Sequence, residues 1–212
     1  MRTEADRAAA LDALRPENVH LDPCRLLLQA MALGEAVALS LFVTKGGRAV
    51  FNACCRRLVD AEGNWGGGFV NYREQDTLRE EYRETAARLA VYMHKLGYWG
   101  PMGAGIMTDE EGRQVVIDMN VRVTGSHPLG ALRGHFGRRG LNVAVLFFPL
   151  MLKLTWEEFE RKFKEELHFG SLVVNAWVHM QGGKTSMTTV TLAAEKLNEF
   201  VERVRAFRME DH

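Results

Sequence analysis

Apolar runs separated by short polar turns are the clearest pattern in the first half of the chain. "AVALSLFV" and "RAVFNACCRRLV" flank the turn "TKGG", and "PMGAGIMTD" and "QVVIDMNVRV" flank the turn "EEGR". Each pattern predicts a β-hairpin. The run "RLLLQAM" is a further candidate strand, and the near-continuous apolar character of "AVALSLFV" is typical of a strand covered on both faces. The sequence therefore predicts an antiparallel sheet.

Apolar residues at three- and four-residue spacing predict helices elsewhere. The clearest case begins near Asp76, which is the predicted N-cap, and ends at Gly97. Its apolar positions are Leu78, Tyr82, Ala86, Leu89, Met93 and Leu96. Further helices are predicted over residues 3–14, 155–167 and 195–207. The second of these starts with Thr155 and Glu158 at the positions of a capping box.

Three segments are harder to assign from their pattern. "LNVAVLFFPLMLKL" contains Pro149 and is too short to span a bilayer, so we expect a buried helix or helix pair. "DAEGNWGGGFVNY" is a glycine-rich loop that either turns beside the site or contacts phosphate, although it lacks the GxxxxGK[ST] pattern. A second glycine-rich loop follows Val123 and becomes helical near Leu141. "SLVVNAWVHM" is a strand, and "TTVTLAA" is a last strand or a loop.

Composition and charge narrow the function classes. The 27 basic and 27 acidic residues give a formal net charge of zero, which excludes a general nucleic-acid or membrane-surface binder. The N-terminus lacks the apolar core of a signal peptide. The three cysteines, Cys24, Cys54 and Cys55, have no metal-binding spacing. We expect the adjacent Cys54 and Cys55 to be small core residues, and we expect a reducing, cytoplasmic location for the protein.

A row of polar side chains follows the apolar part of "VVIDMNVRVTGS". Asp118, Asn120 and Arg122 alternate with apolar residues, so a strand would project all three from one face. Carboxylate and amide oxygens suit a partly hydrated Mg²⁺ that bridges phosphates, and a guanidinium can pair with a phosphate oxygen. The spacing alone equally fits a solvated strand face with a local Asp–Arg ion pair.

The longer segment "GYWGPMGAGIMTDEEGRQVVIDMNVRVTGS" resembles the C-terminal core of ATP-grasp enzymes, in which a hairpin strand ends in an acid, any residue and then Asn, often followed by Arg. "DMNVRVTGSHPLGALRGHFGRRGL" resembles the ATP-grasp proteins of filamentous fungi described from solid-state culture. The resemblance covers residues 24–150 well and implies an α+β fold, an ATP-grasp-like C-terminal lobe whose mainly antiparallel sheet is flanked by helices.

The resemblance also implies a chemistry, in which ATP activates a carboxylate as an acylphosphate that an amine or thiol then attacks. ATP and Mg²⁺ are the expected cofactors, and a small-molecule carboxylate is the expected substrate. Asp118 and Asn120 match the family's magnesium ligands and Arg122 its catalytic, phosphate-contacting cation. Ser126 and His127 match a loop that closes on the acceptor substrate. The implied nucleotide contacts are the hinge backbone of Gln29, Ala30 and Met31, and the carboxylate of Glu35 for the ribose.

Two departures from the family pattern shape the expected organisation. The family usually has another carboxylate where this chain has Gly105, and no lysine precedes Gln29 to contact the α- and β-phosphates. We therefore expect residues 1–23 to be a remnant of a preceding lobe, 24–150 the core and 151–212 an extension of it. The chain would be a truncated ligase, completed by a homodimer or a partner chain that supplies the missing lobe. The alternative is a non-catalytic binding or oligomerisation module.

Overall fold

The computed structural model describes residues 3–13, 34–59, 65–180 and 185–205. The chain divides into two compact units, residues 1–31 and 32–212. In the first unit the described element is helix α1 (Glu4–Ala13), as its sequence predicts. The predicted strand "RLLLQAM" and the hinge residues Gln29, Ala30 and Met31 lie outside the described residues.

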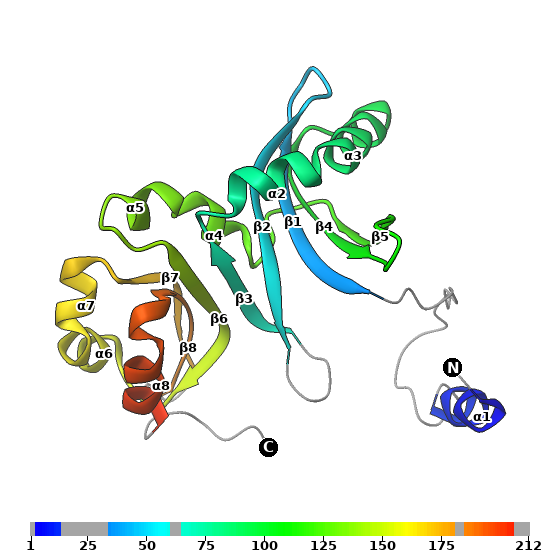
Figure 1. The fold of residues 1–212 in the computed structure, drawn as a ribbon. Helices are drawn as coiled ribbons and strands as arrows, with labels where there is room; N and C mark the ends of the chain where they lie inside the picture. The colour runs from blue at the N-terminus through cyan, green and yellow to red at the C-terminus, as the bar shows by residue number, and fades with distance from the viewer. Residues whose placement is uncertain (1–2, 14–33, 60–64, 181–184, 206–212) are drawn as a thin grey trace. The chain divides into compact units, whose positions relative to one another are not determined.

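The second unit is built on one eight-stranded sheet in which every neighbouring pair is antiparallel, in the order β5-β4-β1-β2-β3-β6-β8-β7 (Figure 1). The strands are β1 (Glu35–Val43), β2 (Ala49–Val59), β3 (Trp65–Asn71), β4 (Gly100–Thr108), β5 (Gln114–Asn120), β6 (Val143–Leu152), β7 (Leu172–His179) and β8 (Ser186–Ala193). The predicted α+β class with an antiparallel sheet flanked by helices is confirmed.

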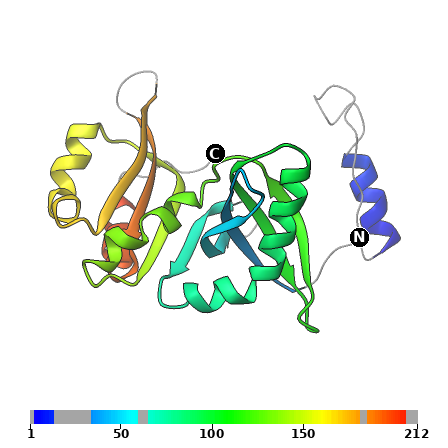
Figure 2. The same ribbon diagram turned by 90° about the horizontal axis from the view of Figure 1, so that it is seen from above.

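Helices cover the sheet unevenly. They are α2 (Gln75–Glu81), α3 (Arg83–Lys95), α4 (His127–Ala131), α5 (Arg133–Gly137), α6 (Trp156–Lys162), α7 (Lys164–Phe169) and α8 (Leu197–Arg205), with a short 3₁₀ turn at Ala194–Lys196. One face packs against α2 and α3 near β1 and β4, and against α6, α7 and α8 near β6, β8 and β7 (Figures 1 and 2). The other face, here called the α4 face, packs against α4 and α5. Within the described residues, none of the helices is long and apolar enough to cross a membrane.

Alternation along the strands assigns side chains to the two faces. On β1, Leu39 and Leu41 belong to the core beneath α3, while Ser40 between them is buried on the α4 face. On β2, Cys54 and Cys55 enter opposite cores, and burial raises the pKa of the Cys54 thiol to about 12. Their expected role as small core residues is confirmed.

Both predicted hairpins are confirmed, but the apolar run "LNVAVLFFPLMLKL" is not helical. Residues 143–152 form strand β6, whose Leu146 lies in the core under α4 and whose Phe147 packs against the core under α8. A continuous apolar run fits a strand buried on both faces as well as a buried helix, because periodicity cannot separate the two. The register with β8 shifts between Phe147 and Leu150, around a proline that lacks the N–H a ladder needs.

Smaller corrections concern the glycine-rich segments and one helix. The predicted loop around residues 65–71 is strand β3, where a Cβ on Gly67 would lie 1.9 Å from the Leu146 carbonyl oxygen. The second glycine-rich segment forms α4 and α5, earlier than Leu141. The long helix is divided at Tyr82, and Glu74 rather than Asp76 occupies the N-cap.

Helix α6 begins as its sequence predicts. The Thr155 hydroxyl accepts a hydrogen bond from the Glu158 N–H at 3.3 Å, and the Glu158 carboxylate accepts one from the Thr155 N–H at 2.9 Å. This reciprocal pair satisfies two amide donors that the first turn of a helix leaves without partners. The predicted capping box is therefore confirmed.

Candidate functional site

The polar row lies at one edge of the sheet, on the α4 face. Strand β5 is an edge strand, and Asp118 and Asn120 stand opposite Gly105 and Gly103 of β4. A Cβ added at Gly105 would lie 2.2 Å from the Asp118 carboxylate, so the absence of a side chain at Gly105 leaves room for this carboxylate over the sheet. Gly105 stands where the resemblance implies a second carboxylate.

The three side chains of the row form one hydrogen-bonded chain. The Asp118 carboxylate accepts from the Gly105 N–H at 2.5 Å and from the Asn120 amide nitrogen at 2.9 Å. The Asn120 amide oxygen accepts in turn from Arg122 at 3.3 Å, and Arg122 also donates to the Val123 carbonyl at 3.1 Å. These contacts orient an acid, an amide and a cation side by side, in the order predicted from their spacing.

The row forms one side of a cavity of about 260 Å³. The other members come from five parts of the chain, and the floor between them is made of small residues. The lining residues are Ala38, Leu39, Arg57, Trp65, Gly103, Ala104, Gly105, Asp118, Asn120, Arg122, Thr124, Gly125 and Ser126. Among the described residues, two cations and one carboxylate line this space, so its charge suits an anionic ligand.

The segment after β5 lines a further side of the cavity with Thr124, Gly125 and Ser126. The Gly125 backbone passes against the Trp65 indole, where a Cβ would lie 2.3 Å from a ring carbon. Ser126 is buried and its hydroxyl lies 3.2 Å from that of Thr124. The structure thus brings Ser126 to the same cavity as Asp118, Asn120 and Arg122.

His127 lies next to this cavity and faces the sheet. Its Nδ1 is 3.2 Å from the Ser40 hydroxyl. The Asn52 amide donates both to that hydroxyl and to the His127 carbonyl, each at 3.1 Å. Gly130 fits over Asn52, since a Cβ there would lie 2.5 Å from the Asn52 amide. Asn52 therefore ties the first turn of α4 to β1 and β2.

The burial of His127 makes stability depend on pH. Burial lowers the pKa of His127 below its usual range because it disfavours the imidazolium. The unfolded chain then takes up this proton first as the pH falls through about 6.5. We expect wild type to lose more unfolding free energy than His127→Gln between about pH 8 and about pH 5 in urea titrations. An equal loss in both proteins would contradict this, and His168→Gln, an exposed histidine, should behave as wild type.

The oxygen donors of the row suit a magnesium ion that is also bound by phosphate. Asp118 and Asn120 offer one carboxylate and one amide oxygen, and no cluster of three His, Cys, Asp or Glu side chains suited to a metal occurs within the described residues. Mg²⁺ keeps several waters and is commonly held by one or two carboxylates together with substrate phosphates. These residues therefore suit an ion that arrives with a nucleotide rather than a permanently bound one.

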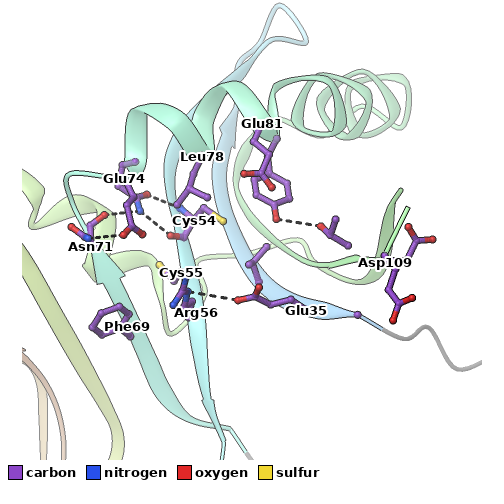
Figure 3. Close-up of a pocket in the computed structure, with 16 residues that line it drawn as sticks. Glu35, Cys54, Cys55, Arg56, Phe69, Asn71, Glu74, Leu78, Glu81 and Asp109 are labelled. Carbon is purple, nitrogen blue, oxygen red and sulfur yellow. Dashed lines mark hydrogen bonds and ion pairs between the residues drawn. The ribbon is translucent and has the colours of Figure 1, made fainter. Parts of the chain in front are cut away.

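Glu35 lies in a different place from the row. It shares the face of Val37 beneath α2, forms an ion pair with Arg56 at 3.7 Å and lines a separate cavity of about 450 Å³ (Figure 3). Asp109 is at the rim of that second cavity, where hydrogen bonds from Arg113 lower the pKa of its carboxyl group. The structure therefore does not bring Glu35 to Asp118 and Asn120.

Two residues of the 260 Å³ cavity, Arg57 and Trp65, have no counterpart in the sequence-based prediction. A signal for Arg57 was available, because neighbouring arginines on a predicted strand must point to opposite faces. Trp65 gave no such signal, since it stands at the start of a segment that reads as a glycine-rich loop. Its position depends on the pairing of β3 with β2 and β6.

Comparisons with known proteins agree with this fold. The structure of N5-carboxyaminoimidazole ribonucleotide synthetase from Thermus thermophilus matches 99% of this chain and 59% of its own, with a TM-score of 0.58 and 17% identity. N5-carboxyaminoimidazole synthase from Aspergillus clavatus, in complex with ADP and 5-aminoimidazole ribonucleotide, matches 96% of this chain and 56% of its own, with a TM-score of 0.52 and 12% identity. The chain thus spans less than two thirds of each of these proteins. No curated protein sequence matches it.

A family model gives a direct assignment from sequence. The model is described as an ATP-grasp domain and matches residues 6–126, more than half of the chain and a range that includes the whole polar row. The chain therefore belongs to the ATP-grasp family.

Proposed function

We propose that this chain carries the phosphate side of an ATP-dependent carboxylate–amine or carboxylate–thiol ligase site. The observation that carries the proposal is the hydrogen-bonded row of Asp118, Asn120 and Arg122 beside a cavity floored by glycine and alanine. Membership of the ATP-grasp family supports it. So does the likeness to one protein named as a synthetase and to another named as a synthase, the latter in complex with ADP.

The proposed reaction has two steps. A carboxylate oxygen of the substrate attacks the γ-phosphorus of ATP, the bond from that phosphorus to the β,γ-bridging oxygen breaks, and acylphosphate and ADP result. An amine or thiol then attacks the acyl carbon, phosphate leaves, and the nucleophile gives up its proton. Arg122 would pair with the charge on the transferred phosphoryl group, and stabilising that charge is the main catalytic requirement of the first step.

Asp118 and Asn120 would hold a magnesium ion bound with the nucleotide, which would offset the charge of the phosphates. The hydrogen bond from the Asn120 amide nitrogen to the Asp118 carboxylate holds that carboxylate and the Asn120 amide oxygen on the cavity side of β5. Ser126, which lines the cavity, is the proposed substrate contact, and the neighbouring His127 is anchored to Ser40 of the sheet. Glu35 lies on the other face of the sheet and is left out of this site.

The remaining parts of the nucleotide site are proposed to come from elsewhere. The hinge backbone of Gln29, Ala30 and Met31 would meet the adenine, and contacts to the α- and β-phosphates would come from another segment, a partner chain or a second copy. One feature favours the alternative, a non-catalytic binding module, because Gly105 leaves the row with a single carboxylate.

Calorimetric titration of ATP into the chain tests the proposal. We expect saturable binding with excess Mg²⁺ and greatly weakened binding with EDTA, because the row needs the ion to accept phosphate oxygens. Phosphate release in the presence of small carboxylates then separates the ligase from the non-catalytic binding module. Release supports the ligase, and nucleotide binding without release supports the module. A chain that takes up no nucleotide at millimolar concentration overturns both.

A further inference from the structure

Arg57 is a cation that faces the cavity on the α4 face. Its neighbour Arg56 projects to the other face, where it pairs with Glu35 at 3.7 Å. Arg57 instead lines the 260 Å³ cavity. Among the residues that the structure describes, no acidic side chain forms an ion pair with it. A guanidinium that lines a cavity and has no ion pair among the described residues can bind an anion from solution.

This cation lies well away from the polar row. Asp118 stands on β5 and Arg57 on β2, and strands β4 and β1 lie between them. Three strand spacings correspond to about 14 Å between the backbones. The space between is floored by Ala38, Gly103 and Gly105, whose lack of long side chains leaves room for a ligand. The cavity therefore offers anion-binding groups at both ends and a bare floor in the middle.

Trp65 supplies an apolar wall beside Arg57. The indole ring packs on Phe148, with ring centroids 5.3 Å apart, and on the Gly125 backbone. These two contacts hold the ring in place, while the indole still lines the cavity. A flat apolar surface next to a cation favours a ligand that joins an apolar group to a carboxylate.

We propose that Arg57 binds the reacting carboxylate of a small acid and that Trp65 packs against the apolar body of the same molecule. This assignment rests on the proposed function, because it makes the Arg57 end of the cavity the acid site and the row the phosphate site. The row already has its own cation for a phosphoryl group in Arg122, which leaves Arg57 for the acid.

The placement answers an electrostatic problem of the first reaction step. A carboxylate and a triphosphate are both anions, and they repel each other as the carboxylate oxygen approaches the γ-phosphorus. A guanidinium paired with the carboxylate neutralises that charge while the other oxygen lone pairs stay available for attack. Because Arg57 would pair with the carboxylate as soon as the acid binds, loss of Arg57 should raise KM for the acid more than it lowers kcat.

Benzoate is the simplest probe, since it joins a flat apolar ring to a carboxylate, and benzamide is its neutral counterpart. Saturation-transfer NMR on the full chain should show benzoate binding to wild type and to Arg56→Gln. We expect the dissociation constant to rise about tenfold or more in Arg57→Gln, and to rise in Trp65→Leu. Benzamide should bind weakly to all four proteins. Circular dichroism of each variant checks that the fold is kept.

Each contrary outcome has a definite meaning. Equal benzoate binding by wild type and Arg57→Gln, equal loss in Arg56→Gln, or no binding to wild type at tens of millimolar benzoate would overturn the proposal. A loss of magnesium–ATP binding in Arg57→Gln would also overturn it, because Arg57 would then be a phosphate ligand. If wild type binds benzoate through Arg57 but takes up no nucleotide, the acid site stands and the ligase proposal fails.

Discussion

Replacing Asp118 with asparagine should weaken magnesium-dependent nucleotide binding by about a hundredfold or more. Loss of even an outer partner of a metal ligand costs roughly 10–100-fold in affinity, and this change removes the only carboxylate of the row. It also breaks the hydrogen-bonded chain. One Asp118 oxygen accepts a hydrogen bond from the Gly105 N–H and the other accepts one from the Asn120 amide nitrogen. An asparagine side chain has a single oxygen, so in either orientation its NH₂ group would face one of these two donors.

The measurement is a calorimetric titration of ATP with excess Mg²⁺ into wild type and Asp118→Asn. Glu111→Gln is the matched control, because Glu111 is an exposed acid in the same hairpin that pairs with Arg113 at 3.0 Å and does not line the cavity. The control should bind nucleotide as wild type does. Unchanged affinity in Asp118→Asn would show that the row is a solvated strand face and not a phosphate platform.

Replacing Phe159 with alanine should lower the free energy of unfolding by about 3–5 kcal/mol. Phe159 is fully buried and is the centre of an aromatic cluster. Its ring centroid lies 4.7 Å from that of Phe163, 5.0 Å from that of Trp177 and 6.3 Å from that of Trp156. Alanine would leave a cavity that three rigid rings cannot fill, since the neighbouring strands hold their positions.

Thermal unfolding followed by circular dichroism should show a Tm lower by about 10 °C in this variant, because one kcal/mol corresponds to roughly 2–4 °C in a chain of this size. Phe169→Ala is the control, since this side chain lies in the next helix and is 56% exposed. Its Tm should stay within about 2 °C of wild type. Similar Tm shifts in the two variants would show that the aromatic cluster is not the core of this part of the fold.

The sequence was most informative where local chemistry decides the structure. The hairpin that carries Asp118, Asn120 and Arg122 was predictable because a short polar turn joins two apolar runs. The start of α6 was predictable because Thr155 and Glu158 satisfy neighbouring amides within one turn. In both cases the partners lie a few residues apart, so no knowledge of the rest of the fold was needed.

The failures have a common physical cause, which is long-range pairing. Strand β6 read as a helix because both of its faces are buried, and only its pairing with β3 and β8 selects the extended form. The family resemblance implies one nucleotide site for Glu35 and Asp118, but their strands present them on opposite faces of the sheet. Arg57 and Trp65 come to line one cavity only when β2, β3 and the segment after β5 are assembled.

The position of β5 at the edge of the sheet carries a thermodynamic consequence. Within the described residues this strand is hydrogen-bonded to β4 alone, so half of its backbone groups gain nothing from a neighbouring strand. The side chains proposed to hold phosphate therefore stand on one of the less supported strands of the sheet. Part of the binding free energy of a nucleotide would offset the cost of ordering this strand. A contact that orders its outer edge beforehand would therefore raise the affinity without touching the ligand.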